Sequence, residues 1–205
     1  MKIPKFIAFE GLDFTGKTTQ INKLSDHLTK HDIKHIITRE PGGTLLGEEI
    51  RKLIFNEEFR PSDQTSFFLF LASRAEHISK IILPALHEGK IVICDRFLLS
   101  TLVYQNTIGY DKILAIHDNI LNGLYPDISI VFDAKPEDII KRKQQNMLRL
   151  NNYYDDIAFR KIHKMRDLFL QYSRSAPFKC QIVDASRGAE DVFNDIALIL
   201  MPQGN

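Results

Sequence analysis

The 205-residue sequence contains no tryptophan, only two cysteines and almost no net charge. Cys94 and Cys180 lie far apart in the chain, each in an apolar run, and do not form a C-x-x-C pair. We therefore expect two buried, reduced thiols. The formal net charge is +1. Nucleic-acid-binding proteins usually carry a strong basic excess, so this value argues against nucleic acid as a partner.

The sequence also lacks a long apolar run. None approaches the about 18 residues that a membrane-spanning helix needs. The N-terminal segment Met1–Lys5 leads directly into the first predicted strand and leaves no room for a signal peptide. We therefore expect a cytoplasmic protein that does not bind membranes.

What is present is an alternation of strand-like and helix-like segments, with an ordinary share of hydrophobic (44%) and charged (26%) residues. Strands are expected at 6–9, 33–38, 91–94, 128–132 and 179–183. Helices are expected from about 18 to 28, at 44–55, 62–87, 98–106 and 110–121, from 136 onward, and at 155–173 and 189–200. Pro84 is expected to kink or end the helix at 62–87. The alternation predicts a three-layer α/β fold, a five-stranded parallel sheet with helices on both faces.

No repeat and no linker rich in Gly, Ser or Pro divides the chain. We therefore expect residues 1–205 to form a single domain. A polar stretch without apolar periodicity, at approximately 143–155, is expected to form a short lid over the site.

The segment Gly11–Thr18 matches the pattern G-x-x-x-x-G-K-[ST] and lies between a predicted strand and a predicted helix. Its glycines allow the backbone N–H groups to surround an anion, next to the positive end of the helix dipole. This predicts a phosphate-binding loop (P-loop) for ATP, with Lys17 on the β- and γ-phosphates and Thr18 on Mg²⁺. The alternative is a glycine-rich turn with a solvated lysine. The candidate ATP-binding residues are Gly11, Leu12, Asp13, Phe14, Thr15, Gly16, Lys17, Thr18 and Thr19.

Asp95 and Arg96 follow the strand predicted at 91–94. The carboxyl ends of parallel strands are where ligands bind in such folds. Asp95 is suited to hold Mg²⁺, directly or through water, and the guanidinium fork of Arg96 is suited to hold a phosphate. The alternative is a structural Asp–Arg pair that caps the next helix.

Two further stretches are candidates for ligand contacts. Arg39–Thr44 follows the second strand with Pro and two glycines, a stiff turn that can approach a ligand closely. Phe70 and Arg74 are four residues apart and share a helix face, which suits stacking and bonding to a nucleobase. The alternatives are a plain strand-to-helix turn, and a core phenylalanine beside a solvated arginine.

A run of basic residues, 141–143, precedes the polar stretch, and Arg149 lies within it. A loop of this kind can close over a nucleotide, whereas the alternative is a solvated helix end. The histidines have no metal-ligand spacing, and we interpret them as surface or helix-face residues. They are His27, His31, His35, His77, His87, His117 and His163.

Taken together, these stretches resemble the thymidylate kinase family. Thr38–Thr44 is similar to the bacterial TREPGGT signature, and Asp95–Gln105 is similar to the family pattern D-R-[FY]-x-x-S-x-x-A-Y-Q, with Val103 in place of Ala. The resemblance covers about Lys5 to Ile199 and implies a P-loop NTPase fold. It also implies phosphoryl transfer from ATP to dTMP with Mg²⁺, and a homodimer.

The resemblance also implies roles at matching positions. Asp13 would contact the sugar 3′-hydroxyl or organise Mg²⁺ and water, and Tyr104 would select deoxyribose. Arg39 and Arg96 would hold the dTMP phosphate. Phe70, Arg74 and Thr101 would contact thymine by stacking, by a bond to O4 and by a polar contact. The full implied substrate set is Asp13, Arg39, Phe70, Arg74, Arg96, Ser100, Thr101, Tyr104 and Gln105, and segment 183–186 would pack near adenine.

The sequence departs from the family in the lid. Many bacterial members carry an arginine in a D-R-x-E stretch, but residues 151–156 here contain none, and Phe14 of the P-loop is not arginine either. We therefore expect Arg149 or Lys143 to supply the missing positive charge. The catalytic set implied is Lys17, Asp13, Arg96 and Arg149, with Thr18 and Asp95 on the metal.

Two alternatives remain on the residues alone. One is another nucleoside monophosphate kinase or a deoxynucleoside kinase. The other is a P-loop ATPase that acts as a switch without transferring phosphate to a nucleotide.

Overall fold

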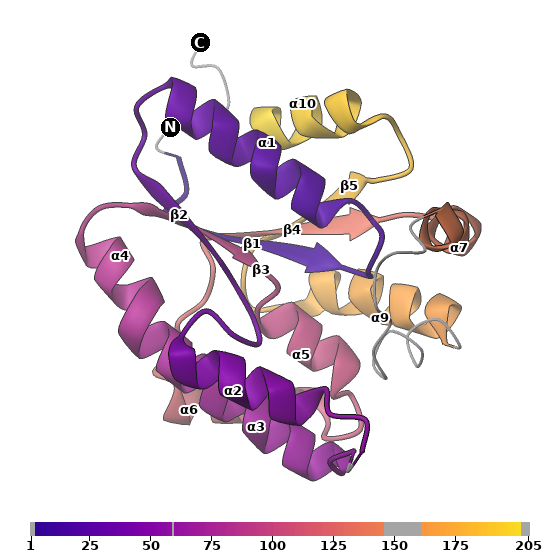
Figure 1. Ribbon diagram of the computed structural model, residues 1–205. Coiled ribbons are helices and arrows are strands. Elements are labelled where there is room, and N and C mark those ends of the chain that lie inside the picture. Colours follow the sequence, from indigo (N-terminus) through magenta and orange to yellow (C-terminus); the bar gives the residue numbers. More distant parts are fainter. Residues whose placement is uncertain (1–2, 59, 146–160, 202–205) are drawn as a thin grey trace.

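The computed structural model describes residues 3–58, 60–145 and 161–201. Within them the chain forms a five-stranded parallel sheet in the order β2-β3-β1-β4-β5, with helices on both faces (Figure 1). The strands are β1 (Phe6–Gly11), β2 (His35–Arg39), β3 (Ile91–Asp95), β4 (Ile128–Asp133) and β5 (Cys180–Asp184). This confirms the predicted three-layer α/β fold.

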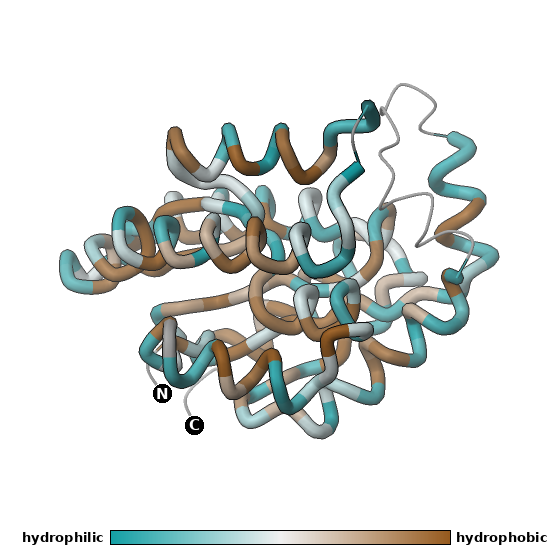
Figure 2. Tube along the Cα trace, turned by 90° about the horizontal axis from the view of Figure 1, so that it is seen from below, coloured by the Kyte–Doolittle hydropathy of each residue, from teal (hydrophilic) through white to brown (hydrophobic). Residues whose placement is uncertain are grey.

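The helices divide between the two faces of the sheet. Helices α1 (Lys17–Lys30) and α10 (Ala189–Leu200) pack together on one face, and α5 (Leu98–Tyr104) and α9 (Ile162–Ser175) pack together on the other (Figure 1). In Figure 2 the helical tubes alternate between teal and brown, as expected for helices with one apolar face. The remaining helices are α2 (Leu45–Ile54), α3 (Asp63–His77), the π-helix η1 (Ile78–Ile82), α4 (Leu83–His87), α6 (Tyr110–Ile120) and α7 (Pro136–Gln145).

The long helix predicted at 62–87 is interrupted. Ser62 caps its beginning by accepting a hydrogen bond from the backbone N–H of Thr65 at 3.3 Å. The π-helical turn Ile78–Ile82 then separates α3 from α4. Pro84 has no N–H to donate to the preceding turn, and a π-turn is one way in which a helix accommodates such a gap. The interruption therefore lies one turn before the proline.

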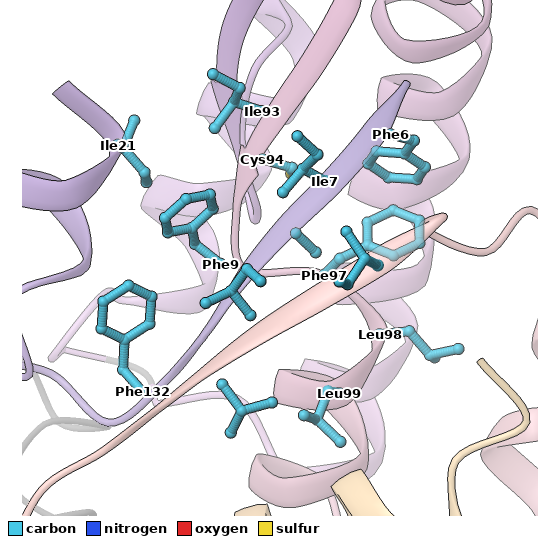
Figure 3. Packing of buried hydrophobic residues seen from close by; sticks show 14 of the residues in the cluster. Phe6, Ile7, Phe9, Ile21, Ile93, Cys94, Phe97, Leu98, Leu99 and Phe132 are labelled. Atoms are coloured by element: carbon cyan, nitrogen blue, oxygen red, sulfur yellow. The ribbon is translucent and has the colours of Figure 1, made fainter. Parts of the chain in front are cut away.

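The core is centred on β1, which is buried along its whole length. On one face, Phe6 meets Phe97 edge to face, with ring centroids 5.0 Å apart. On the other face, Phe9 lies on Phe132 at 5.5 Å, beside Ile21 of α1 (Figure 3). Each such buried side chain contributes about 1.5–3 kcal/mol to stability. This packing fixes the carboxyl ends of β1 and β3, from which the site is built.

From the sequence we interpret the histidines as surface or helix-face residues; His77 and His117 do lie on helices, α3 and α6, but on buried faces and not at the surface. His77 bonds to Thr38 and Glu40, and Nε2 of His117 bonds to the carbonyl oxygen of Leu124. Burial lowers the pKa of His117 to about 4. For His77 in particular, the partners lie far away in the sequence, so residue spacing could not reveal its burial.

Both cysteines are free thiols, as expected, with Cys94 buried and Cys180 partly buried. Burial raises the pKa of Cys180 to about 12. Among the described residues, no helix combines the length and apolarity needed to cross a membrane.

Candidate active site

The P-loop runs from the end of β1 to the start of α1. Gly11 has a φ of +131°, and a Cβ there would lie 2.7 Å from the carbonyl oxygen of Phe132, so only glycine fits. The side chain of Lys17 folds back over the loop. Its Nζ donates to the carbonyl oxygens of Gly11 at 3.1 Å and Leu12 at 2.8 Å. The ammonium group of Lys17 therefore bonds to the beginning of the same loop.

Lys17 is almost completely buried beside other charged groups. Burial and the nearby Arg96 lower the pKa of its ammonium to about 8, against the opposing effect of Asp13, whose Oδ1 lies 4.0 Å away. An anion placed next to Lys17 would favour its charged form. A phosphate bound beside this lysine would therefore raise its pKa again.

Arg96 links the P-loop to α5. Its Nη1 donates to the carbonyl oxygen of Gly11 at 2.8 Å and to Ser100 Oγ at 3.1 Å, and its Nη2 donates to Asp13 Oδ1 at 2.8 Å. Its guanidinium carbon lies 5.3 Å from the ring centroid of Tyr104. Burial opposes the charged form, but Asp13 outweighs it and raises the pKa of Arg96.

Glu10 is a buried carboxylate that sequence reasoning missed. It accepts hydrogen bonds from Ser100 Oγ at 2.5 Å and from the backbone N–H of Phe97 at 2.9 Å. Burial raises its pKa despite these bonds. Glu10 therefore holds the turn that carries Arg96. The available signal was one acidic residue inside an otherwise apolar strand.

The alternative interpretation of Arg74 as a solvated arginine is wrong, because its side chain is only 3% exposed. Its Nε and Nη2 both lie 2.7 Å from Glu40 Oε2, and Nη2 also donates to Thr101 Oγ1 at 2.8 Å. The guanidinium lies over the ring of Phe97 at 4.7 Å. Burial raises the pKa of Glu40, but Arg74 and His77 outweigh it and lower that pKa.

A cavity of about 880 Å³ opens between the carboxyl ends of β1, β2 and β3 and helices α2, α3 and α5. Every residue of the implied substrate set lines it: Asp13, Arg39, Phe70, Arg74, Arg96, Ser100, Thr101, Tyr104 and Gln105. The structure thus brings together residues from four stretches of the sequence.

A smaller cavity of about 380 Å³ lies on the other side of the P-loop. Residues 13–19 line it, together with Ala185, which belongs to the segment expected near adenine. Arg142 also lines it and donates to the carbonyl oxygens of Ala185 at 2.8 Å and Thr15 at 3.4 Å. Only the basic run 141–143 hinted at this residue, without singling it out.

The two cavities share Asp13, Thr18 and Asp95. Oδ1 of Asp95 is buried and has no hydrogen-bond partner in the described part of the chain. Carboxylate and hydroxyl oxygens suit Mg²⁺, which usually binds one or two protein groups together with substrate phosphates. The residues 3–58, 60–145 and 161–201 contain no group of three or more His, Cys, Asp or Glu side chains suited to a metal. Asp95 and Thr18 therefore fit a magnesium ion whose other ligands are phosphate oxygens or water.

The comparison with known proteins gives one answer. A family model described as thymidylate kinase matches residues 9–196. Thymidylate kinase from Ligilactobacillus salivarius is 36% identical over 96% of this chain and 97% of its own length. The thymidylate kinases of Staphylococcus haemolyticus (39% identical, 96% of this chain and 97% of that protein) and Symbiobacterium thermophilum (40%, 93% and 90%) are similar as well.

The chain belongs to the thymidylate kinase family. The resemblance inferred from the sequence motifs is thereby confirmed.

Arg51 is a further residue of the site that the sequence motifs did not single out. It lines the larger cavity, and its Nη1 donates to the carbonyl oxygen of Pro41 at 2.9 Å. Burial and the neighbouring Arg39 lower its pKa. Arg39 itself is 53% exposed and bonds Glu48 Oε2 at 2.8 Å. Two guanidinium groups, those of Arg39 and Arg51, therefore line this part of the cavity, and Glu48 pairs with the first.

The lid predicted for this member of the thymidylate kinase family lies mostly outside the described residues. That applies to Arg149 and to 146–155 as a whole. Lys143 is described and belongs to α7.

Proposed function

We propose that this protein is a dTMP kinase, which transfers the γ-phosphoryl group of ATP to dTMP and forms dTDP and ADP. The observation that carries the proposal is the junction of the two cavities at Asp13, Thr18 and Asp95. Phosphoryl transfer requires donor and acceptor phosphates to meet in line, and this junction offers one place for both. The names of the relatives, all thymidylate kinases, point to the same reaction.

ATP would occupy the smaller cavity. The backbone of the P-loop would surround its phosphates, and Lys17 would exchange its carbonyl partners for phosphate oxygens. Arg142 and Ala185 would flank the adenosine end of that cavity. Donor binding would thus replace weak neutral acceptors with charged ones.

dTMP would occupy the larger cavity, with its phosphate toward the P-loop. Arg39 and Arg96 would hold that phosphate, and Phe70 and Arg74 would contact thymine. Tyr104 would lie against the sugar and exclude a 2′-hydroxyl. Gln105, Ser100 and Thr101 complete the lining.

Catalysis would rest on positioning and on charge stabilisation, because the acceptor is an anionic phosphate that needs no strong base. Lys17 and Arg96 lie where negative charge grows on the transferred group, and both are held by fixed partners before substrate arrives. Asp13 would orient Arg96 and the acceptor. A cationic lid residue, Arg149 or Lys143, would complete the charge balance.

Asp95 and Thr18 would hold Mg²⁺. When bound, the ion supplies neutralisation of charge on the phosphate oxygens. The buried, unpartnered Oδ1 of Asp95 supports this assignment.

We also propose that the protein is a single domain and a homodimer. Support for the dimer comes from large apolar side chains on α2 and α3, two helices that pack against each other. Leu45 is 93% exposed and Phe68 is 65% exposed. Such side chains are favoured at subunit interfaces.

The test is a set of initial rates with ATP and Mg²⁺ against dTMP, dUMP, dCMP, AMP, GMP and thymidine. We expect dTMP to have the highest kcat/KM. A preference for thymidine would indicate a deoxynucleoside kinase, and ATP hydrolysis without any phosphorylated acceptor would indicate a switch ATPase. Either result would refute the proposal.

A matched pair of variants on α1 tests the donor site. Lys17→Met should lose at least about 100-fold in kcat, because a cation aimed at the transferred group is removed. Lys23→Met removes a lysine of the same helix that pairs with Glu190 on the surface. That control should keep wild-type turnover.

A further inference from the structure

Beneath the base-binding end of the larger cavity lies a buried chain of hydrogen bonds. Thr38 Oγ1 lies 2.6 Å from His77 Nε2, and His77 Nδ1 lies 3.0 Å from Glu40 Oε1. Glu40 Oε2 in turn accepts from Arg74 Nε at 2.7 Å, and Arg74 Nη2 donates to Thr101 Oγ1 at 2.8 Å. All five residues are buried. This series of hydrogen bonds includes Arg74, the side chain that we expect to recognise thymine.

The direction of these bonds is fixed by chemistry. An ionised carboxylate only accepts, so His77 donates to Glu40 from Nδ1. Glu40 therefore holds two side chains at once, His77 on Oε1 and Arg74 on Oε2. Without His77, one of its oxygens would lose its partner, and the carboxylate could rotate away from the geometry that Arg74 requires.

The same bonds leave one edge of Arg74 for a ligand. Its Nε and Nη2 are engaged by Glu40 and Thr101, whereas no described side chain bonds to Nη1. Arg74 lines the larger cavity although it is nearly buried. A guanidinium only donates hydrogen bonds, so this edge favours a base with a carbonyl oxygen over one with an amino group.

The network also fastens the turn after β2 to α3. Ser73 Oγ accepts from the backbone N–H of Gly42 at 3.1 Å. At Gly43, a Cβ would lie 2.7 Å from the imidazole of His77, so the turn and the ring are in close contact. The turn that begins with Arg39 and the helix that carries Arg74 are therefore one packed unit.

We propose that Glu40 and His77 are positioning residues. They hold Arg74 in the orientation that recognises the base, and they thereby set the preference for a 4-oxo pyrimidine over a 4-amino pyrimidine. The inference rests on the proposed function, because it takes the larger cavity as the dTMP site.

A purely structural role for the network would predict something different. It would lower stability when any bond is lost and would leave the choice of base unchanged. Two amide substitutions separate these roles, because the amide nitrogen of Asn matches the place of Nδ1 and that of Gln matches the place of Nε2. His77→Asn keeps the donor to Glu40, and His77→Gln keeps the contact with Thr38.

We expect His77→Gln to raise the KM for dTMP about tenfold, with kcat changed less than about threefold. We expect its preference for dTMP over dCMP to fall by a similar factor. His77→Asn should stay within about threefold of wild type on each measure. His117→Gln is the control, because His117 is equally buried but bonds to the carbonyl oxygen of Leu124 and not to Thr38 or Glu40. It should lower the melting temperature without changing the base preference.

A double-mutant cycle shows whether the effect passes through Arg74 and does not depend on His77→Gln folding well. Arg74→Met alone should raise the KM for dTMP. Glu40→Gln should raise it in the wild-type background but not in the Arg74→Met background, because the group that it orients is gone. In the Arg74→Met background, Glu40→Gln should also restore stability, since it removes an unpaired buried charge.

The outcomes separate the two proposals. If wild type does not prefer dTMP, the proposed function fails. If wild type prefers dTMP but the Asn and Gln variants lose affinity equally, or the Glu40→Gln effect persists without Arg74, the positioning role is wrong. The positioning role is supported if His77→Asn keeps the affinity for dTMP that His77→Gln loses, and if the effects of Glu40→Gln and Arg74→Met on KM are not additive.

Discussion

Replacing Gly43 by alanine offers a direct measure of how tightly the turn after β2 packs on α3. Gly43 has a φ of +80°, in the left-handed region, and its added Cβ would lie 2.7 Å from both His77 and Thr38 Oγ1. The backbone conformation alone costs about 1–2 kcal/mol for alanine. Overpacking against a fixed ring adds about 1–3 kcal/mol. The expected total loss in the free energy of unfolding is therefore about 2–5 kcal/mol.

Gly89 supplies the matched control. Its φ is +75°, nearly the same as that of Gly43, but a Cβ there would meet nothing within 4 Å. Gly89→Ala should thus lose only the backbone contribution of about 1–2 kcal/mol. The difference between the two variants isolates the contact with His77 and Thr38.

Urea denaturation followed by circular dichroism measures both losses, from the shift of the midpoint at an unchanged m-value. The KM for dTMP should rise in Gly43→Ala, because the displaced imidazole belongs to the network beneath Arg74, and should stay unchanged in Gly89→Ala. Equal destabilisation in the two variants would refute the close packing of the turn on His77. An unchanged KM in Gly43→Ala would refute the link between this packing and the base site.

Three further predictions concern the P-loop side of the site. The folded-state pKa of Lys17 is about 8, below its ordinary value of 10.5, so its buried charge costs stability below pH 8 and that cost disappears as pH rises toward 10.5. The free energy of unfolding of Lys17→Met should therefore exceed that of wild type by up to about 3 kcal/mol at pH 7 and by little at pH 10.5. Urea denaturation at the two pH values measures this difference, and a difference that does not depend on pH would contradict the prediction. Arg142→Ala should raise the KM for ATP about tenfold and leave the KM for dTMP unchanged in steady-state assays, since Arg142 lines only the smaller cavity; equal changes in both would contradict the assignment. Asp95→Asn should raise the Mg²⁺ concentration for half-maximal activity about tenfold, and an unchanged titration would remove Asp95 from the metal site.

The fold and much of the candidate site followed from local patterns. The predicted helix at 189–200 has the observed bounds, and the P-loop lies between strand and helix as the motif requires. Asp95, Arg39 and Asp13 meet because parallel strands bring their carboxyl ends to one edge, which is a property of the architecture.

What the sequence did not reveal are the partners that act across long separations. Glu10 and Glu40 are single acidic residues whose meaning depends on Ser100 and Arg74, and nothing in their own neighbourhoods shows that pairing. The same holds for Arg142, which differs from its basic neighbours only by the helix face that meets the P-loop. The residue types at these positions are known from the sequence, but the orientation and burial of their side chains are not.

The bond between Arg96 and Asp13 has a consequence for how substrate enters. The guanidinium that we propose for the dTMP phosphate already donates to a carboxylate and a carbonyl oxygen, so an arriving phosphate would meet a cation whose charge is already neutralised. On that proposal, Asp13 would keep the guanidinium oriented, and its negative charge would weaken the binding of other anions. The carboxylate would thereby lower the affinity for phosphate alone and favour a ligand that also contacts the rest of the cavity.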